Sequence, residues 1–332
     1  MKSAFQISLL LIFSLILSSC GDSKVTELRS SGKTAEMIIS LNHKTKWEEP
    51  VGDSIKAFFN TEYEVLPQAE PLFEMAFIPI DRLTENKMFR AHHNILIVDI
   101  DKNVTETKFE AKKDFWAAPQ RVIKITSPSD EDFIAYWQEK KESIYGILMD
   151  SEHERLNKTF HAFRDRDIQN DIIKTFGFTL EISSGFYVAT NRNDFMWIRK
   201  EAKHHSQGII IYTYDFVDTM AFEQARIISF RNAITEEFIP GPAVDSYMTV
   251  AEEYAPILSR RIGLNDLFAV ETRSLWRLEN DFMGGPFVSY TFVDERNNKV
   301  ITIDGYIYAP NKPKRDLMIQ IESIAHSIKF TE

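Results

Sequence analysis

The sequence predicts an α+β fold, with mainly antiparallel sheets packed against helices. Three observations support this prediction. Apolar segments of strand length recur along the chain and are joined by polar turns of hairpin length. Residues 130–176 form the longest stretch with apolar side chains at helical spacing. Strands come in runs and then give way to helices, as in α+β folds, and this order allows two similar α/β sandwich-like halves.

The first half begins with apolar residues at 36–41, which predict a strand. Asp53 has the position of an N-cap for a short helix. The run HNILIVDI at 93–100 predicts a strong strand, and a polar turn near 101–103 should lead to further strands up to residue 126.

A long helical region follows these strands. Ser129 and Asp132 have the spacing of a capping box, so we expect the helical region to begin there. Gly177 lies just past the last apolar residue of the region and predicts its end, because glycine readily adopts the left-handed conformation that terminates helices.

The second half contains several strands, one central helix and one closing helix. Strands are expected at 178–182, 186–189, 195–199, 208–214, 247–250, 267–278, 287–293 and 300–308, with a helix near 221–237 and a polar hairpin turn at 294–299. The closing helix has Pro313 in its first turn and Leu317, Ile321, Ile324 and Ile328 at helical spacing. The expected divisions are a signal peptide at 1–19, a lipidated cysteine and polar tether at 20–34, an N-terminal half at 35–176 and a C-terminal half at 177–332.

Composition narrows the possible functions. The net charge of −10 is spread along the chain with no basic block, which argues against nucleic acid or anionic lipid head groups as partners. With 12 glycines in 332 residues and neither G-x-G-x-x-G nor a P-loop motif, nucleotide binding by those routes is not expected, and we predict no cofactor. A core is available, since 44% of the residues are apolar and 25 are phenylalanine.

The N-terminus has the parts of an export signal. Lys2 supplies the positive charge, and residues 9–17 supply an apolar stretch that is too short to span a bilayer. The sequence Leu17-Ser18-Ser19-Cys20 resembles the lipobox of bacterial lipoproteins, which implies a lipid on Cys20 and cleavage before it. The alternative is an ordinary secretory signal with an incidental cysteine. Since Cys20 is the only cysteine, a lipid there leaves no disulfide.

The expected cellular location follows from this lipid anchor. The partner is the membrane, reached through lipid on Cys20, and the location is the outer membrane. Gly21 directly after the cysteine is not acidic, which favours the outer membrane by analogy with lipoprotein sorting. The periplasmic face is preferred, and exposure on the cell surface stays open.

Several motifs were weighed as metal sites. Oxygen-bearing side chains have the ligand spacing of an EF-hand, at Asp99, Asp101, Asn103, Thr105, Thr107 and Glu110, but Val104 takes the glycine position and the flanks predict strands. A polar β-hairpin turn is the favoured interpretation. His92-His93 and His204-His205 are adjacent pairs whose rings should point in different directions. His153, Asn157 and His161 share one helix face beside Glu154. Solvent-facing histidines are favoured in each set, and no metal is predicted.

No catalytic motif is present. There is no G-x-S-x-G, and the only Ser-x-x-Lys, at Ser30 and Lys33, lies in the expected tether. Catalytic triads and carboxylate pairs are defined by spatial geometry, so a site assembled from distant residues stays open.

Residues 273–290 (RSLWRLENDFMGGPFVSY) are the candidate interaction segment. Arginine and aromatic side chains near a tight turn are typical of interaction surfaces. The candidate residues are Arg273, Trp276, Arg277, Asn280, Asp281 and Met283, with a turn at Gly284-Gly285-Pro286. A strand pair with charges facing water is the favoured alternative.

Two resemblances extend this interpretation. The order of features resembles an uncharacterised domain-of-unknown-function family of Bacteroidota lipoproteins, on the residues Trp47 to Asp53, Leu66 to Gln68, Glu70-Pro71, His93 to Leu96 and Trp276 to Pro286. This resemblance implies an envelope lipoprotein and brings no known activity. Residues 177–214, with the ending Gly305 to Pro310 and its helix, look like α-β-α sandwiches of the photosystem-II PsbP and Mog1 type.

The sequence therefore predicts a cell-envelope lipoprotein of unknown activity, and it favours a non-enzymatic protein that binds a protein or small ligand or has a structural role. The alternative is an envelope hydrolase that acts on glycan or peptide with residues brought together by folding.

Overall fold

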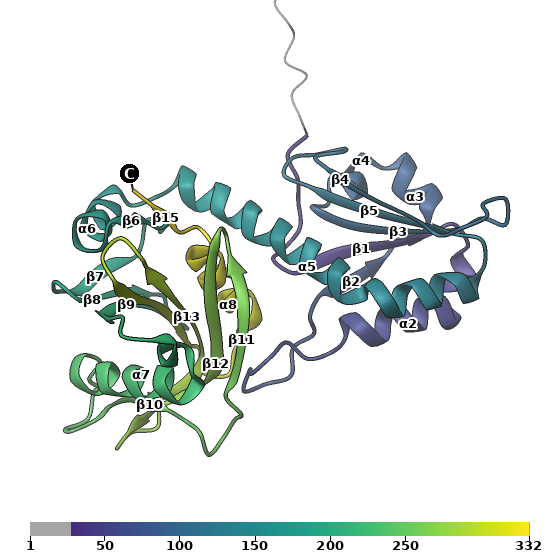
Figure 1. The fold of residues 1–332 in the computed structure, drawn as a ribbon. Coiled ribbons are helices and arrows are strands. Elements are labelled where there is room, and N and C mark those ends of the chain that lie inside the picture. The colour runs from purple at the N-terminus through teal and green to yellow at the C-terminus, as the bar shows by residue number, and fades with distance from the viewer. Residues whose placement is uncertain (1–27, 332) are drawn as a thin grey trace, which may run out of the picture.

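The computed structural model describes residues 28–331 and contains two large sheets that are connected by one long helix (Figure 1). The predicted α+β class is confirmed. The predictions for the signal peptide at 1–19 and for Cys20 fall outside the described residues. Residues 28–34, which we expected in the tether, lie against the first half, where Ser31 bridges to His92.

The first sheet has five strands in the order β2-β1-β3-β5-β4. Their bounds are β1 Glu36–Leu41, β2 Glu74–Phe77, β3 Asn94–Ile100, β4 Lys108–Lys113 and β5 Arg121–Ser127. Pairing is parallel from β2 through β1 and β3 to β5, and only β4 is antiparallel to its neighbour. Helical crossovers such as α2 (Pro50–Phe59) return the chain in the same direction, which makes the next strand parallel. This half therefore departs from the antiparallel pairing that dominates the molecule.

The second sheet has eight strands, and all of its pairs are antiparallel. Its order is β10-β12-β13-β14-β9-β8-β7, with β11 also paired to β12. The bounds are β7 Tyr187–Asn191, β8 Phe195–Glu201, β9 Ser206–Asp215, β10 Tyr247–Val250, β11 Leu258–Leu264, β12 Leu267–Glu279, β13 Gly284–Asp294 and β14 Lys299–Tyr308. The short strands β6 (Phe178–Thr179) and β15 (Lys329–Phe330) pair separately. The two halves thus differ in sheet topology.

The long helical region is two helices, α5 (Asp130–Ala162) and α6 (Arg166–Phe176). The Ser129 side chain accepts a hydrogen bond from the Asp132 amide, as the capping box predicts. Gly177 is left-handed, with φ of 74°, and ends α6 as predicted. Asp53 is not an N-cap: α2 begins at Pro50, whose fixed φ suits the first helical position, and Asp53 lies in its first turn.

The remaining helices cover the sheets. They are α3 (Ile80–Glu85), α4 (Lys87–Arg90), α7 (Gln224–Phe238) and α8 (Arg315–Ala325), with 3-10 turns η1 (Lys44–Glu48) and η2 (Thr219–Phe222). α8 packs between α5 and the second sheet. Between residues 28 and 331, neither α5 nor another helix has the long apolar stretch that a membrane crossing requires.

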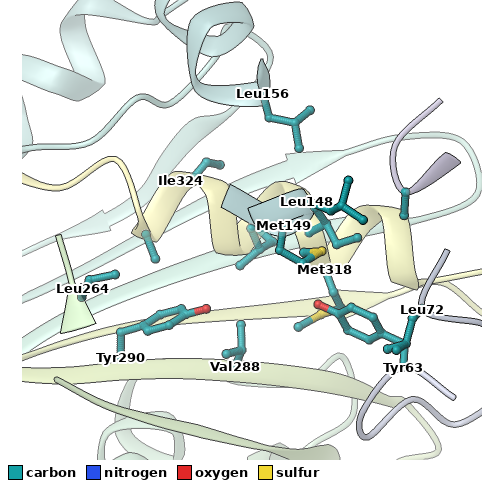
Figure 2. Packing of buried hydrophobic residues seen from close by; sticks show 14 of the residues in the cluster. Tyr63, Leu72, Leu148, Met149, Leu156, Leu264, Val288, Tyr290, Met318 and Ile324 are labelled. Atoms are coloured by element: carbon teal, nitrogen blue, oxygen red, sulfur yellow. The ribbon is translucent and has the colours of Figure 1, made fainter. Parts of the chain in front are cut away.

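One large apolar core continues across both halves, and two smaller clusters, one in each half, are separate from it. It includes side chains of α5, α8, both sheets and the segment after α2, such as Tyr63 and Leu72, which lie near Leu148, Met149 and Met318 (Figure 2). Continuous burial of this kind contributes roughly 25 cal/mol for each Å² of apolar surface removed from water. The halves are therefore held together by packing as well as by chain connection.

Glu70 provides a polar link between the halves. The backbone amides of Lys314 and Arg315 donate to its carboxylate at 2.6 and 3.1 Å. The side chain of Lys314, the N-cap residue of α8, makes no capping hydrogen bond. A carboxylate from the first half therefore caps the last helix of the second half, where the helix dipole favours negative charge.

Candidate functional site

A cleft runs between α5 and the second half of the molecule. It consists of two adjoining cavities of about 530 and 580 Å³, and Asp150, His153 and His326 line both of them. We call it the α5 cleft. Asn157 and His161 line the first cavity, and side chains of β12, α8 and the segment after α2 line the second.

Four segments that are distant in sequence supply the polar side chains of the α5 cleft. His153 comes from α5, and Glu322 and His326 are one helical turn apart at the end of α8. Glu271 and Arg273 are two residues apart on β12 and therefore face the same side of the sheet. Tyr63 follows α2 and reaches the cleft from the first half, so both halves contribute to the site.

Buried ion pairs form one wall of the α5 cleft. The Arg273 guanidinium donates to Glu271 at 2.7 and 3.0 Å and to Glu322 at 2.7 Å. The Tyr63 hydroxyl also hydrogen-bonds to Glu322. Arg260 extends the network, since its guanidinium lies 2.7 Å from Glu271. Each guanidinium nitrogen of Arg273 thus donates to a carboxylate, as a buried charge requires.

The ion pairs and the burial of this wall shift the pKa values of its ionisable side chains. Burial alone would raise the pKa of Glu322, but the charge of Arg273 and the nearby His153 outweigh burial and hold that pKa well below its usual range. Burial likewise opposes ionisation of Glu271, and the Arg273 charge lowers its pKa overall. Burial raises the pKa of Tyr63 well above its usual value. These carboxylates therefore stay ionised and this phenol stays neutral around neutral pH.

His153 is the contrasting member of the α5 cleft. It is 9% exposed, and neither ring nitrogen has a hydrogen-bond partner among the described residues. Its Nε2 lies 3.7 Å from Glu322, which is longer than a hydrogen bond. Its ring centroid is 4.4 Å from that of His326. Burial, and then the charge of His153, lower the pKa of His326 to about 3.

Tyr290 adds a second unsatisfied group nearby. Its ring meets the edge of His326 at 5.4 Å, and its hydroxyl, on a residue that is 1% exposed, has no partner among residues 28–331. Buried polar atoms in native proteins are nearly always hydrogen-bonded to protein, water or ligand. Of the unsatisfied atoms in this region, the His153 nitrogens, the Asn157 Oδ1 and the Glu181 Oε2 belong to residues that line the α5 cleft, whereas Tyr290 lines neither cavity.

The α5 cleft is not arranged as a metal site. The rings of His153 and His326 lie close together, with an angle of 34° between their planes. In the part of the chain that the structure describes, no group of three or more His, Cys, Asp or Glu side chains is placed to hold a metal ion.

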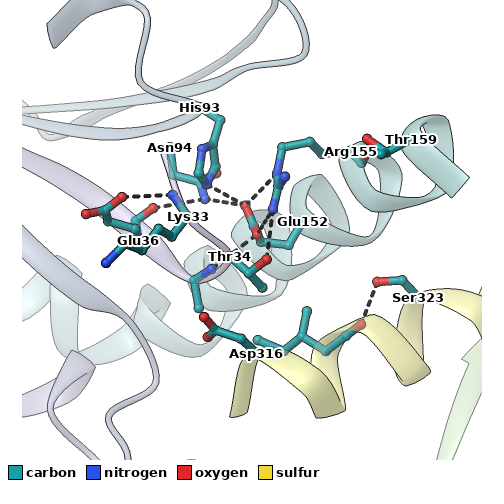
Figure 3. Close-up of polar contacts among 12 residues, drawn as sticks. Lys33, Thr34, Glu36, His93, Asn94, Glu152, Arg155, Thr159, Asp316 and Ser323 are labelled. Atoms are coloured by element: carbon teal, nitrogen blue, oxygen red, sulfur yellow. Dashed lines mark hydrogen bonds and ion pairs between the residues drawn. The ribbon is translucent and has the colours of Figure 1, made fainter. Parts of the chain in front are cut away.

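A second carboxylate–histidine pair lies on the other side of α5, in the first half. Glu152 is fully buried and lies 2.9 Å from the Nε2 of His93 (Figure 3). It also accepts from Asn94 at 2.7 Å, from Arg155 at 2.7 Å and from the Ala35 amide at 3.2 Å. We call this set the Glu152 clamp.

The structure corrects our expectation for His92 and His93. They are 9% and 2% exposed and do not face solvent. Their rings also stack, at 4.8 Å and 20°, because the two residues lie in the turn before β3, where strand alternation does not apply. His204 is exposed and His205 half-buried, and the two lie between β8 and β9, away from the α5 cleft.

The helix-face prediction for His153, Asn157 and His161 is confirmed, because all three line the first cavity. The expectation of solvent exposure is wrong for His153, which α8 covers, and holds for His161, which pairs with Glu181.

The EF-hand-like residues form a connection between strands. Residues 101–107 join β3 to β4, and β5 lies between these two strands in the sheet. The segment is therefore a crossover and not the hairpin turn that we favoured. Asp99 pairs with Lys124 at 2.9 Å, and Asp101 accepts hydrogen bonds from Asn103.

The structure separates the candidate interaction segment into two places. Arg273 belongs to the α5 cleft, whereas Trp276 is buried on the other face of β12 and donates to the Ile307 carbonyl at 3.2 Å. Arg277 pairs with Glu253 and Glu279 at the surface. Trp276 and Met283 line a separate cavity of about 330 Å³ with aromatic side chains of β8 and β14.

The turn of this segment is at residues 280–283, where Asn280 is left-handed, with φ of 60°. Asn280 is exposed and Asp281 half-buried. Gly284, Gly285 and Pro286 do not form the turn and instead begin β13. A side chain at Gly285 would collide with the backbone of Ile307, so glycine here permits close packing of the strands.

Sequence reasoning missed Tyr63, Glu271, Glu322 and His326. One signal was present for the last two, because Glu322 and His326 put polar groups one turn apart on a helix with an otherwise apolar core-facing side. No local pattern connects them to Tyr63 or to β12.

Comparisons with known proteins place the chain among domains of unknown function. Residues 165–327 match the model of a domain of unknown function, DUF4837, and residues 30–161 match another, DUF8532. The predicted resemblance to an uncharacterised family is thereby confirmed, and its lipoprotein and Bacteroidota character stays a prediction. No curated protein matches the sequence.

Two solved structures are similar to part of the chain. A mutant of protein Mog1 is 8% identical, over 47% of this chain and 92% of that chain, with a TM-score of 0.31. The cyanobacterial PsbP (CyanoP) from Synechocystis sp. PCC 6803 is 10% identical, over 51% of this chain and 91% of that chain, with a TM-score of 0.30.

Proposed function

We propose that this chain, which carries two domains of unknown function, is a lipid-anchored envelope protein that binds a small polar ligand in the α5 cleft. The anchor rests on the lipobox-like Leu17 to Cys20, and the outer membrane, on its periplasmic side, is the proposed location. Binding without chemical change is favoured over catalysis.

One observation carries the ligand proposal: His153 is buried at the junction of two cavities and keeps both ring nitrogens unpartnered among the described residues. A polar group in that state normally has a partner in the functional molecule. The cavities, at about 530 and 580 Å³, fall in the size range of small-molecule sites.

The electrostatics favour binding because the shifted pKa values of the cleft residues lie far from neutral pH. A general acid needs a raised carboxyl pKa, whereas the pKa values of Glu271 and Glu322 are lowered. His326, with a pKa of about 3, is a weak base. The wall is thus suited to hold fixed charges toward a ligand.

The test is native mass spectrometry of the protein purified from its own membranes. We expect a bound small molecule on the wild type and on His204→Phe, which changes an exposed histidine away from the cleft, and its loss in His153→Phe. An unliganded wild type, or a ligand that survives His153→Phe, would contradict the proposal.

The anchor has a separate test. Cys20→Ala should abolish incorporation of labelled palmitate, because the thiol is the site of lipid attachment. Unchanged labelling would disprove lipidation at this residue.

A second candidate function is hydrolysis of glycan or peptide in the envelope. Its specific support is the proximity of His153 to the carboxylate of Glu322, which lies 3.7 Å away and whose negative charge would stabilise a protonated imidazole. Turnover of envelope glycan or peptide by the wild type, lost in His153→Ala, would favour this function over simple binding.

The surface at residues 280–283 is the remaining candidate contact for an envelope protein. Phe282 at its tip is fully exposed. Loss of a co-purifying protein on Phe282→Ser would support this contact, and retention of every such protein would exclude it.

A further inference from the structure

The first described residues lie on a defined face of the first half. The Ala118 amide donates to the Leu28 carbonyl at 2.9 Å, the Ser30 amide donates back to Ala118 at 3.1 Å, and Ser31 donates to Ala91 at 2.8 Å. The segment thus runs along the loop between β4 and β5, at the edge that is uppermost in Figure 1. We call this edge the entry face.

Large apolar side chains are exposed on the entry face. Leu28, Phe115 and Phe163 are 43, 47 and 63% exposed. Leu28 is bonded to the same loop that carries Phe115, and Phe163 lines one cavity together with Arg29 and the neighbouring loop residue Pro119. Exposed apolar side chains that gather in one region mark interaction surfaces.

The cavity beside these side chains has basic character. It measures about 230 Å³, and its described lining includes Arg29, Arg155 and Lys158 and the hydroxyl-bearing residues Ser30, Ser31 and Thr159, with no acidic residue. Arg155 and Lys158 also pair with Glu152 and Glu154 of α5. Arg29 lines the cavity and forms no ion pair with another residue of the range 28–331.

We propose that the entry face rests on the membrane and that the phosphate of an anionic phospholipid occupies this basic cavity. The inference depends on the proposed lipid anchor. Leu28 is eight steps along the chain from Cys20, and an extended chain reaches at most about 3.4 Å per step, so the entry face stays within about 27 Å of the anchor. Apolar side chains beside a basic cavity match the interfacial and head-group layers of a bilayer.

The local charge at the entry face differs from the net charge of the whole chain. A net charge of −10 argues against anionic lipids when it is averaged over the chain. Attraction to a membrane is local, however, because charges beyond about one Debye length, roughly 10 Å at moderate salt, are screened. A basic cavity at the point nearest the anchor therefore acts independently of acidic residues on distant faces.

The test measures whether the processed chain co-sediments with lipid vesicles. The chain carries Cys20→Ala, so that no acyl chain is attached. We expect binding to vesicles that contain phosphatidylglycerol, weaker binding to pure phosphatidylcholine and loss of binding at high salt. Each removed basic charge near the surface is expected to weaken binding about fivefold. Arg29→Glu combined with Phe163→Ser should therefore abolish sedimentation.

The matched control combines Arg261→Glu with Val217→Ser, an exposed arginine and an exposed apolar residue outside the entry face. The proposal is overturned if the control variant loses as much binding as the entry-face variant. It is also overturned if inorganic phosphate binds to the wild type while vesicles do not, or if the face binds a second copy of the chain or another protein but no lipid.

Attachment of the lipid anchor is measured separately, by palmitate labelling of the wild type. Labelling together with equal sedimentation of both variants would reject the membrane-resting face and leave the anchor intact. Sedimentation that depends on Arg29 without palmitate labelling would reject the anchor and leave the entry face as a lipid-binding surface.

Discussion

Glu152 and His153 are neighbours on α5, yet they belong to two different carboxylate–histidine pairs, Glu152 with His93 and Glu322 with His153. The histidines of the two pairs differ in their hydrogen bonding. In the first half, His93 donates from Nδ1 to the Ser31 carbonyl at 2.7 Å, while its Nε2 lies 2.9 Å from Glu152 in an ion-pair contact that lacks hydrogen-bond geometry. In the second half, His153 has no hydrogen bond from either nitrogen among the described residues. Both histidines are buried, so burial does not distinguish them.

The difference indicates which pair is structural. A buried polar group whose partners all come from the protein fixes a conformation, and the Glu152 clamp ties α5 to β3 and to the segment before β1. A buried polar group that lacks partners and lies on a cavity is available to a ligand. The Glu152 clamp should therefore matter for stability, and His153 for binding.

The largest expected effect is on stability, from Glu152→Ala. It leaves His93 and Arg155 without their carboxylate and the Ala35 amide without an acceptor, and breaking a buried ion pair typically destabilises by about 3 to 5 kcal/mol. Urea denaturation measures this change. Glu154→Ala, on the same helix but at the surface, is the control and should change stability by less than about 1 kcal/mol. Equal effects would mean that the Glu152 clamp does not hold α5 against the first sheet.

Acid should lower the stability of the protein through groups on both sides of α5, in a different pH range for each side. Burial opposes ionisation of Glu152, but its contacts with His93 and Arg155 lower its pKa to about 2. A lowered carboxyl pKa gives stability that is complete above the unfolded value near 4.5 and is lost as the pH falls through about 2.

The second prediction concerns His326, whose pKa is lowered to about 3, mainly by burial. The unfolded chain takes up this proton near pH 6.5 and the folded chain does not, so stability falls as the pH decreases from 6.5 toward 3. Between pH 6.5 and 5 the loss is about 2 kcal/mol. The free energy of unfolding of His326→Phe should be less dependent on pH in this range than that of the wild type, and His161→Phe, at an exposed site, should match the wild type.

The sequence was informative where a local rule determines the structure. The cap at Ser129 and the left-handed Gly177 were predicted because each depends on a few neighbouring residues. The run HNILIVDI was recognised as a strand, but its parallel pairing was not predicted, although uninterrupted apolar strands are typical of sheets covered on both faces.

The α5 cleft was not predictable in the same way. Tyr63, His153, Arg273 and Glu322 come together only because α8 packs between α5 and the second sheet. That arrangement depends on long-range packing and leaves no spacing in the sequence. The interpretation of His153 as solvent-facing failed for this reason, since α8, which covers it, is more than 150 residues away in the chain.

The smallest expected effect is the stability change of His153→Phe, and it is the sharpest test of the comparison. Because His153 makes no hydrogen bond among the described residues, phenylalanine of similar shape should change stability by less than about 1 kcal/mol, and relief of an unsatisfied buried group can even increase it. His93→Phe is the matched variant and should destabilise by roughly 1 to 3 kcal/mol, because it removes the contacts with Ser31 and Glu152. Both are measured by urea denaturation, alongside ligand retention by mass spectrometry. A stable His153→Phe that loses the ligand, beside a destabilised His93→Phe that keeps it, would assign binding to one side of α5 and support to the other. The reverse pattern would show that the hydrogen-bond state of a buried histidine does not distinguish the two roles in this protein.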